Sequence, residues 1–548
     1  MFCWHMHQPQ YLVSDNSGYE MPWVYLHGIK DYTDMAAHLE AVPAARAVIN
    51  FSPVLLEQLT DYAKRIASWV RHGVPIGDPL LDALREPVSP GTEQRESIIR
   101  ACLRAHKTHM IERFVDYAEL ARRAEAELAG SAARLDDAAL HDLVVWYHLA
   151  WMGESLRREN AFIRSLIEKG SSYTLDERFE LTRRLGQILA DLLPRYRRLA
   201  ERGQIELCVS PYAHAMLPLL IDFNCAAEAD PESRLPGAGY PDGYTRSEWH
   251  TRRAIEVFEK HFGFRPSGCW PSEGGLSDAV LRLLEGCGFS WTASGTNVLN
   301  HSLGYDDELA PYWVWKRAGV NVACFFRDDE LSDLIGFSYA RWKPEDAVAD
   351  LVRRLERISD AATDDMKPVV SIILDGENVW EYFPNNGFFF LQELYQQCSE
   401  HPRVNLTTFS DVLSQRGHFP NLSHVVAGSW VAGNFSLWVG HAEKNRAWEL
   451  LCAAREALDQ KLRDSVFTAE DTARILKQLS VCEGSDWFWW LGDDNDAEST
   501  RQFDTLFRRQ LSRLYTLASL PVPAELGEPI VQSHKPSSPV GTIRKANP

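Results

Sequence analysis

Two carboxylates in this chain follow strongly apolar runs and have the chemistry for acid–base work. Glu273 closes the run "PSGCWPSE", and Asp375 closes "PVVSIILD". Each is followed by glycine, which lets another group approach closely. Two carboxylates on either side of one bond are what glycosidic cleavage needs, since one attacks the anomeric carbon and the other protonates the leaving oxygen. The alternative for each acid is a strand-end residue that caps the following helix.

Tryptophan side chains near these acids offer flat apolar faces on which sugar rings can stack. The chain has 18 tryptophans, and several gather in a few segments: Trp270, Trp380, Trp430, Trp438, Trp487, Trp489 and Trp490. Aromatic residues also fill hydrophobic cores, which is the alternative for each of them. We expect Trp270 and Trp380 to contact substrate.

The densest aromatic run is "SDWFWWLGDDN", residues 485–495. Successive residues of a helix turn by about 100°, so its adjacent aromatics cannot all face one core. We predict that at least one of these tryptophans comes within about 10 Å of a catalytic carboxylate and forms a wall of the cleft. The candidate substrate-binding residues of the run are Trp487, Trp489, Trp490 and Asp494.

Two histidines near the N-terminus suggest a different chemistry. In "HMHQPQY", His5 and His7 are two positions apart, so both point to one face of a strand. Together with a carboxylate such as Asp375 they have the ligand types of a zinc site, as a zinc-dependent carbohydrate deacetylase or mannosidase would require. No third ligand follows at short spacing. We therefore expect both histidines to bind or orient substrate, and we predict no metal and no other cofactor.

Further ionisable residues lie beside predicted strands. Arg327 ends the run "VNVACFFR" and has the geometry to orient a catalytic carboxylate through two parallel hydrogen bonds. A structural ion pair, for example with Asp328 or Asp333, is the alternative. Glu206, within "QIELCVS", is a candidate for positioning the sugar or the acid.

The elements that must position these residues are predicted to alternate between strand and helix. Amphipathic stretches such as 248–262 and 277–286 separate short apolar runs, which predicts a parallel α/β architecture. Seven or eight units favour a barrel, in which chemistry is done at the carboxyl ends of the strands. The predicted strands are residues 1–7, 46–52, 204–210, 266–273, 288–294, 320–328, 368–375 and 404–410.

Two regions are predicted to be helical throughout. Residues 95–203 are rich in Ala, Leu, Arg and Glu at helical spacing and interrupt the barrel between its second and third strands. Residues 440–519 are again helical. We divide the chain into a catalytic barrel (1–415), a C-terminal helical domain that contributes to the cleft (416–520), and a Pro- and Ser-rich tail (521–548) that we expect to be poorly ordered.

Composition narrows the choice of partner. The chain has 548 residues, 45% of them hydrophobic, and a formal net charge of −19, which disfavours a phosphate backbone as ligand and suits a neutral one such as a sugar. The ten cysteines show no regular spacing, and no secretion signal or membrane-spanning run is visible. We expect a cytoplasmic protein that binds neither nucleic acid nor membrane.

Taken together, the motifs resemble glycoside hydrolase family 57. That family is marked by five motifs, and all five have counterparts here in order over residues 1 to about 520. They are "HQP" at His7–Pro9, "GQIELCVSPYAH" around Glu206, "GCWPSEGG" with Glu273, "LDGENVWEYFPNNG" with Asp375, and "EGSDWFWWLGDDN" from Glu483.

The resemblance implies a distorted (β/α)7 barrel, followed by a helical domain that helps to build the cleft. It also implies retaining chemistry on α-glucans, with Glu273 matching the nucleophile and Asp375 the general acid/base. The "WFWW" form of the fifth motif most resembles the α-amylase and amylopullulanase branch. A 4-α-glucanotransferase remains an alternative, whereas a non-catalytic glucan-binding protein would not need both acids. We expect burial and the charge of Glu273 to raise the pKa of Asp375.

Overall fold

The structure is a computed structural model that describes residues 1–14, 18–85, 93–130, 134–362 and 367–531. In these residues seven parallel strands form one sheet with the order β8-β1-β2-β3-β4-β5-β7. A short β6 pairs antiparallel with β7, and β9 follows β6. The strands are β1 (Phe2–Met6), β2 (Ala47–Phe51), β3 (Ile205–Val209), β4 (Gly268–Cys269), β5 (Trp291–Gly295), β6 (Trp315–Arg317), β7 (Ala323–Arg327), β8 (Ile372–Asp375) and β9 (Asn421–Leu422).

The parallel strands curl until the two ends of the run meet. Arg327, the last residue of β7, forms an isolated parallel bridge with Ser371, directly before β8. Its guanidinium Nε also donates to the carbonyl of Ile373, at 2.8 Å. This seam completes the distorted (β/α)7 barrel that the sequence and the family resemblance predict.

The strands are continuous apolar runs because both faces of a parallel strand are covered. All five residues of β1 are buried, and β1 lies between β8 and β2. Its register places His5 opposite Asp375 on one side and opposite Asn50 on the other. Polar side chains of three strands therefore end at one level at the carboxyl end of the barrel.

Helices connect the strands and begin and end at recognisable residues. α3 has Pro53 at its first position and Gly73, with φ of 69°, after its last, while Ser277 caps α13 by accepting from the backbone of Val280. The connecting helices are α1 (Trp23–Ile29), α2 (Asp31–Ala41), α3 (Pro53–His72), α4 (Pro79–Ala83), α11 (Leu217–Ile221), α12 (Gly243–Phe262), α13 (Asp278–Gly286), α14 (Thr296–Leu303), α15 (Asp329–Asp333), α16 (Pro344–Ala361), α17 (Phe388–Glu400) and α18 (Phe409–Gln415).

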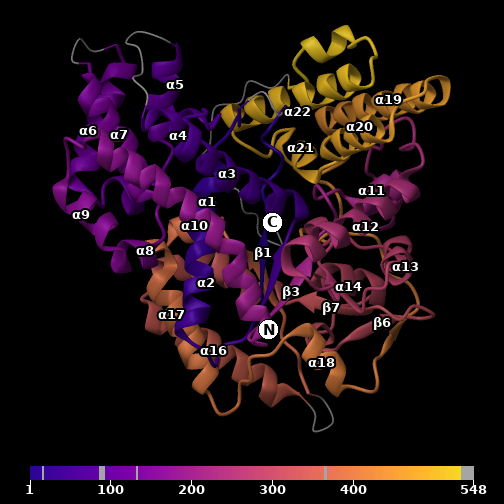
Figure 1. The fold of residues 1–548 in the computed structure, drawn as a ribbon. Coiled ribbons are helices and arrows are strands. Elements are labelled where there is room, and N and C mark those ends of the chain that lie inside the picture. The colour runs from indigo at the N-terminus through magenta and orange to yellow at the C-terminus, as the bar shows by residue number, and fades with distance from the viewer. Residues whose placement is uncertain (15–17, 86–92, 131–133, 363–366, 532–548) are drawn as a thin grey trace.

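Two helical regions stand over one end of the barrel, at the upper left and upper right of Figure 1. The first is the insertion predicted between the second and third strands, and the second is the predicted C-terminal helical region. The insertion contains α5 (Glu93–Cys102), α6 (Val115–Leu128), α7 (Asp137–Ala150), α8 (Glu154–Glu159), α9 (Ala161–Lys169) and α10 (Leu175–Glu201). The C-terminal region contains α19 (Ala442–Asp464), α20 (Ala469–Cys482), α21 (Ser485–Trp490) and α22 (Ala497–Leu517).

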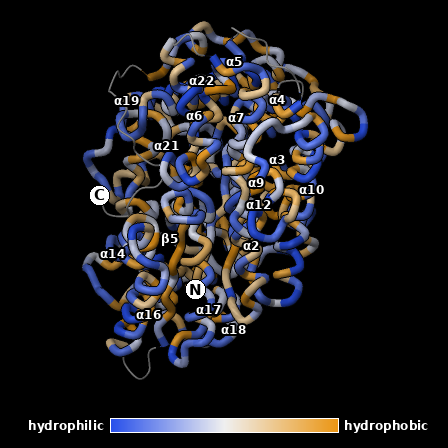
Figure 2. The backbone as a smooth tube through the Cα atoms, turned by 90° about the vertical axis from the view of Figure 1, so that its left-hand side faces the viewer, coloured by the Kyte–Doolittle hydropathy of each residue, from blue (hydrophilic) through white to orange (hydrophobic). Residues whose placement is uncertain are grey.

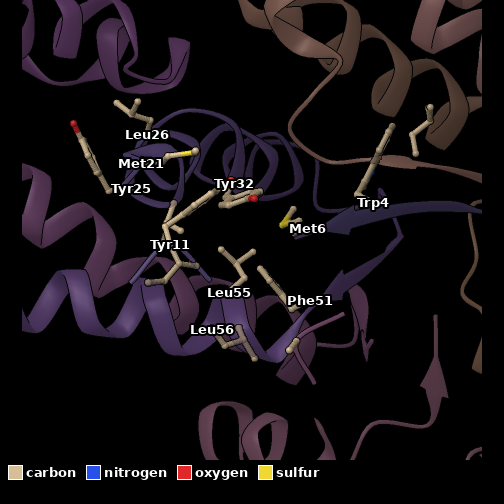
Figure 3. Close-up of a cluster of buried hydrophobic side chains, with 14 of the residues drawn as sticks. Trp4, Met6, Tyr11, Met21, Tyr25, Leu26, Tyr32, Phe51, Leu55 and Leu56 are labelled. Carbon is tan, nitrogen blue, oxygen red and sulfur yellow. The ribbon is translucent and has the colours of Figure 1, made fainter. Parts of the chain in front are cut away.

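The core joins these layers. Hydrophobic segments gather around β5, and hydrophilic residues are spread along the outer helices (Figure 2). Figure 3 shows side chains from β1, β2 and the first three helices packed together, among them Trp4, Met6, Tyr25, Leu26, Tyr32, Phe51, Leu55 and Leu56. Residues far apart in sequence thus share one hydrophobic interior.

One predicted strand is wrong. Residues 404–410 form no strand, because Thr408 caps α18 and that helix begins at Phe409. The tail was predicted from residue 521, and its residues 532–548 lie outside the described part of the chain. Among the described residues, we find no helix with the length and apolarity to cross a membrane.

Candidate active site

A cavity of about 510 Å³ opens at the carboxyl ends of the barrel strands. Glu273 and Asp375 both line it, so two residues that are far apart in sequence share one site. Trp489 and Trp490, from α21, line the same cavity. The helices before β2, the segment that follows α5 and the end of α7 also contribute, through Trp23, His27, Lys30, Arg104, His106 and Trp151.

Glu273 has an unusual backbone conformation. It follows β4 in the short 3-10 helix η3 (Ser272–Gly274), with φ 59° and ψ 23°. This left-handed region is uncommon for residues other than glycine and costs on the order of 1–3 kcal/mol, so neighbouring contacts must hold it. Gly274 also has φ of 59°, and a Cβ there would lie 3.1 Å from atoms of Trp270 and Trp430. The motif "SEGG" is therefore a tight turn packed against two tryptophans.

Both carboxylate oxygens of Glu273 accept hydrogen bonds. The indole of Trp430 donates to Oε2 at 3.2 Å, and the hydroxyl of Ser485 donates to Oε1 at 3.1 Å. His214 Nδ1 lies 2.8 Å from the same hydroxyl. Two donors on separate oxygens fix the orientation of the carboxylate and favour its ionised form.

Asp375 is the last residue of β8. The side-chain amide of Asn378 donates to its Oδ2 at 3.0 Å. Burial raises the pKa of Asp375, while the hydrogen bond from Asn378 and the positive charge of Arg327 act in the opposite direction. A carboxyl with a raised pKa is suited to carry and donate a proton.

Neighbouring negative charges also affect Glu273. Burial, followed by the charges of Asp486 and Asp375, raises the pKa of Glu273 to about 8. The sequence-based expectation that burial raises the pKa of Asp375 agrees with the structure. Repulsion between two carboxylates is mutual, so the expectation that the charge of Glu273 adds to the shift of the Asp375 pKa stays a prediction.

The rings of three histidines that line the cavity form a stack. The ring centroids of His7 and His214 are 3.9 Å apart, and those of His5 and His214 are 4.9 Å apart. His5 Nδ1 lies 2.6 Å from Asn50 Oδ1. Burial lowers the pKa of His5 to about 3 and that of His214 well below its usual value, so both rings are neutral near pH 7.

His7 connects this stack to α21. Its Nδ1 lies 2.7 Å from the hydroxyl of Ser52, and its Nε2 lies 3.0 Å from both carboxylate oxygens of Asp486. Its backbone N–H donates to Glu377 Oε1 at 3.3 Å. His7 therefore links β1, the loop after β8 and the fifth motif.

The donor set at the histidines has metal-binding residue types but not a convergent geometry. His7, His214 and Asp486 place ligand atoms within 4.8 Å of one another. However, the rings of His7 and His214 are stacked, with an angle of 18° between their planes. Nitrogen lone pairs lie in the ring plane, so these two run nearly parallel instead of meeting at one point. This set therefore does not fit a tetrahedral zinc site. The rings of His5 and His7, the two histidines of the zinc site considered from the sequence, are also nearly parallel, with 19° between their planes.

Arg327 lines the cavity, but its donors are engaged elsewhere. Its Nη1 donates to Asp329 at 2.7 Å and its Nη2 to Asp333 at 2.9 Å. With Nε on the carbonyl of Ile373, Arg327 forms no bidentate contact with Glu273 or Asp375. The structural ion pair weighed as the alternative is what the geometry shows. The guanidinium also lies 5.5 Å from the ring centre of Trp430.

Three of the predicted sugar-binding tryptophans are buried behind the site. Trp270 packs edge-on against Trp430, and Trp380 donates its indole N–H to the carbonyl of Gly376 at 3.0 Å. Trp487 donates to the carbonyl of Val481 at 2.7 Å and lies in the helical core. None of the three is among the residues that line the cavity.

Two other predicted residues lie away from the cavity. Glu206 is the second residue of β3, towards the opposite end of the barrel, where Trp291 and Ser410 donate to it at 2.8 and 2.5 Å. Asp494 lies 3.1 Å from Lys444 Nζ. We leave both out of the proposed site, together with the buried tryptophans.

A buried ion pair anchors the fifth motif. Glu483 is fully buried and accepts from Arg246 of α12 at 2.7 and 2.9 Å, and it lies 2.7 Å from His250 Nε2. These partners hold the pKa of Glu483 well below its usual range, despite its burial. The next residues pair with the second motif, since the N–H of Ser485 donates to the carbonyl of His214 at 2.9 Å.

Several residues of the site escaped the sequence prediction. Trp430, Ser485, Asp486, His214 and Glu377 line the cavity or contact a residue that does. His214 ends the second motif and Asp486 lies in the fifth, so motif membership was an available signal for both. Ser485 also lies in the fifth motif, and Trp430 belongs to the clustered tryptophans. The sequence did not indicate that the folded chain brings these two residues to Glu273.

Comparisons with known proteins agree with this arrangement. The family model for glycosyl hydrolase family 57 matches residues 1–422. No curated protein sequence matches the chain. A family 57 branching enzyme from Thermococcus kodakaraensis shares the fold with a TM-score of 0.58 and 16% identity, over 98% of this chain and 96% of the other.

Two further solved structures share the fold. An α-amylase from Thermotoga maritima has a TM-score of 0.55 and 14% identity, over 94% of this chain and 92% of its own. A 4-α-glucanotransferase from Thermococcus litoralis has a TM-score of 0.52 and 14% identity, over 94% of this chain and 59% of its own. The likeness extends beyond the segment matched by the family model and includes the helices that complete the cavity. With its matched segment covering most of its length, the chain belongs to glycosyl hydrolase family 57.

Proposed function

We propose that the chain is a retaining glycoside hydrolase of the α-amylase and amylopullulanase type. Its substrates would be α-glucans such as starch, glycogen and maltooligosaccharides, with pullulan as a further candidate. The observation that carries this proposal is that two partly buried carboxyls, Glu273 and Asp375, line one cavity walled by tryptophan. Neutral sugars suit a cavity in which aromatic faces alternate with hydrogen-bonding groups.

Two displacements account for the reaction. In the first, a Glu273 oxygen bonds to the anomeric carbon, the glycosidic C–O bond breaks, and the proton of Asp375 passes to the leaving oxygen. In the second, Asp375 takes a proton from water as the water oxygen attacks the same carbon and releases Glu273. The donors on Glu273, Trp430 and Ser485, orient the attacking carboxylate for the first step.

Transfer to a second sugar is the alternative within the same mechanism. A 4-α-glucanotransferase differs only in what attacks the glycosyl–enzyme intermediate. Transfer requires an acceptor sugar to reach the intermediate before water does, and Trp23, Trp151 and Trp430 in the cavity lining offer aromatic faces on which such an acceptor could stack. The two activities are separated by their products, and not by the residues that perform the chemistry.

Product analysis tests the proposal. Wild-type enzyme incubated with maltoheptaose should release shorter sugars, and longer sugars as well would identify transfer. Maltotriose from pullulan would identify α-1,6 cleavage. NMR of the first product should show the anomer of the substrate, and inversion would contradict double displacement.

Variants test the two roles. Glu273→Gln and Asp375→Asn should each lower kcat by on the order of 10³-fold or more on maltoheptaose, because one loses the nucleophile and the other the proton donor. Glu248→Gln, which changes an exposed glutamate of α12, is the matched control and should keep wild-type activity. Near-normal cleavage by either active-site variant would remove that residue from the mechanism.

The zinc-dependent alternative has a separate test. A deacetylase or mannosidase that used His5 and His7 would lose activity on treatment with EDTA and regain it with Zn²⁺. We expect α-glucan cleavage to survive chelation, in line with the stacked ring geometry. Activity that depends on Zn²⁺ would replace our proposal with this one.

The cellular location is part of the proposal as well. All ten cysteines are free thiols, and nine of them are buried. Such usage is typical of a reducing compartment, which supports a cytoplasmic enzyme acting on intracellular glucan.

A further inference from the structure

A second concave region lies beside the active-site cavity. It is a groove of about 630 Å³ between the side formed by α4 and α5 and the outer helix α22. Ala101 of α5 and Thr505 of α22 both line it. The groove is thus built from both helical regions that stand over the barrel.

The groove is continuous with the cavity. Met21, Arg104, Glu498 and Gln502 line both of them. At this boundary Arg104 donates to Glu498 at 2.5 Å and to Gln502 at 3.2 Å. These three side chains form a bar between the two spaces, which we call the Arg104 bar.

The bar is weak in energetic terms. The side chains of Arg104 and Glu498 are 34% and 62% exposed. Exposed ion pairs contribute at most about 1 kcal/mol, because water screens them and ordering the side chains costs entropy. A ligand that lies across the boundary can displace these side chains at little cost.

The charges of the groove nearly cancel, with five acidic residues and four arginines in its lining. Arg509 pairs with Glu20 at 2.7 Å, and Arg100 lies 4.0 Å from Glu96. Together with the Arg104 bar, opposite charges alternate along the lining. A surface of paired charges favours a neutral ligand with many hydroxyls over an anion. Guanidinium groups donate to hydroxyls and carboxylate groups accept from them, while the opposite charges largely cancel.

We infer that this groove extends the substrate cleft and binds the part of a long α-glucan chain that projects past the cavity. The inference rests on the proposed function for the class of ligand. The Arg104 bar then separates the subsites near the catalytic carboxyls from those of the distal chain. Long chains gain contacts that short chains cannot reach.

A blocking substitution tests this inference. Thr505 and Thr516 are both exposed residues of α22, and each hydroxyl donates to the carbonyl four residues earlier, at 2.9 Å. Only Thr505 lines the groove. Thr505→Trp should fill the groove, and Thr516→Trp is the matched control with the same chemical change on the same helix.

The readout is the ratio of kcat/KM for long linear maltooligosaccharides to kcat/KM for maltotetraose. Thr505→Trp should lower this ratio by about tenfold, which corresponds to about 1.4 kcal/mol. Thr516→Trp should keep the wild-type ratio. Equal ratios in the wild type and Thr505→Trp would overturn the inference. Arg501→Ala, which removes a side chain from the groove without adding bulk, should lower the ratio in the same direction if Thr505→Trp folds poorly.

A binding measurement separates this inference from the proposed function. Calorimetry in the Glu273→Gln background should show that added Thr505→Trp weakens binding of a long maltooligosaccharide, whatever the enzyme does to it. Binding that is unaffected would overturn the groove while leaving hydrolysis intact. If no α-glucan binds or is cleaved, both proposals are wrong.

Discussion

At the scale of single residues, the two catalytic candidates act as one titrating pair. Burial raises the pKa of Asp375, and burial with two neighbouring charges raises that of Glu273 to about 8. We expect the pair to hold one proton between pH values set by both groups, and that proton must reside on Asp375 when the bond breaks. The pair therefore carries one proton both in the free enzyme and at the moment of bond cleavage.

This pairing predicts the pH dependence of activity. kcat/KM should follow a bell whose descending limb lies near pH 8, because above it the pair loses its last proton and no acid remains to protonate the leaving oxygen. Initial rates on maltoheptaose from pH 5 to about 10 would measure it. Activity that stays level up to about pH 10 would contradict a shared proton.

Trp430→Phe sharpens that test. The indole hydrogen bond stabilises ionised Glu273 and lowers its pKa, so losing it should raise the pKa, move the descending limb to higher pH and lower kcat at pH 7. Trp438→Phe is the control with the same chemical change, because Trp438 is buried and its indole N–H has no partner among the described residues. A limb that shifts equally in both variants would show a general packing effect.

The sequence identifies acids more readily than their partners. Glu273 and Asp375 are predictable because an apolar strand ending in a carboxylate is a local pattern. Trp430 and Ser485 are not, since their contacts with Glu273 span 157 and 212 residues of sequence. The raised pKa of Glu273 also depends on the charge of Asp486, whose position only the folded chain reveals.

At the scale of elements, α21 is the helix that brings the C-terminal region to the barrel. Its aromatic residues divide as the helical turn requires: Trp487 and Phe488 face the core, and Trp489 and Trp490 line the cavity. The prediction that not all could face one way therefore agrees with the structure, although the sequence could not say which ones would turn inward. The distance of about 10 Å to a catalytic carboxylate stays a prediction.

The anchor of α21 predicts a coupled loss. Glu483→Gln leaves Arg246 buried with a weaker partner, and breaking such a pair costs about 3–5 kcal/mol. Because Ser485 and Asp486 follow directly, kcat should fall together with thermal stability. Glu248→Gln, which alters an exposed pair on the same helix α12, should change neither. Calorimetry and kcat measured side by side would show whether the two losses occur together.

Strand prediction failed where local pattern and capping compete. Residues 404–410 alternate like a strand, yet Thr408 accepts from the backbone of Asp411 and starts a helix. The edge strands β6 and β9 are only three and two residues long and leave no periodic signal. The seven parallel strands were predictable because each is a buried run followed by a helix.

At the scale of the whole molecule, the ionisation of Glu273 lowers the free energy of unfolding. The pKa of Glu273 is raised in the folded state to about 8, from an unfolded value near 4.3. Between these values the folded chain binds more protons than the unfolded chain, so stability falls as pH rises. This loss of folding stability is absent below about pH 4 and reaches its full size above about pH 8.

Glu273→Gln should therefore melt higher than the wild type at pH 8, by about 2 °C or more, and the difference should shrink towards pH 5. Differential scanning calorimetry across this range measures it. Glu248→Gln, with an exposed side chain, should follow the wild type at every pH. A difference that grows as pH falls would reverse the sign of the pKa shift.

The link between His7 and Asp486 has a consequence for how the protein is made. These residues are 479 positions apart, so a ribosome adding roughly 5–20 residues per second needs about 25–100 s between them. During the first part of that interval β1 has emerged without its partner β8, and α21, which carries Asp486, follows more than 100 residues after β8. Until β8 arrives, we expect the nascent chain to expose one open edge of β1, and such an edge is the kind of surface that promotes aggregation and that chaperones protect.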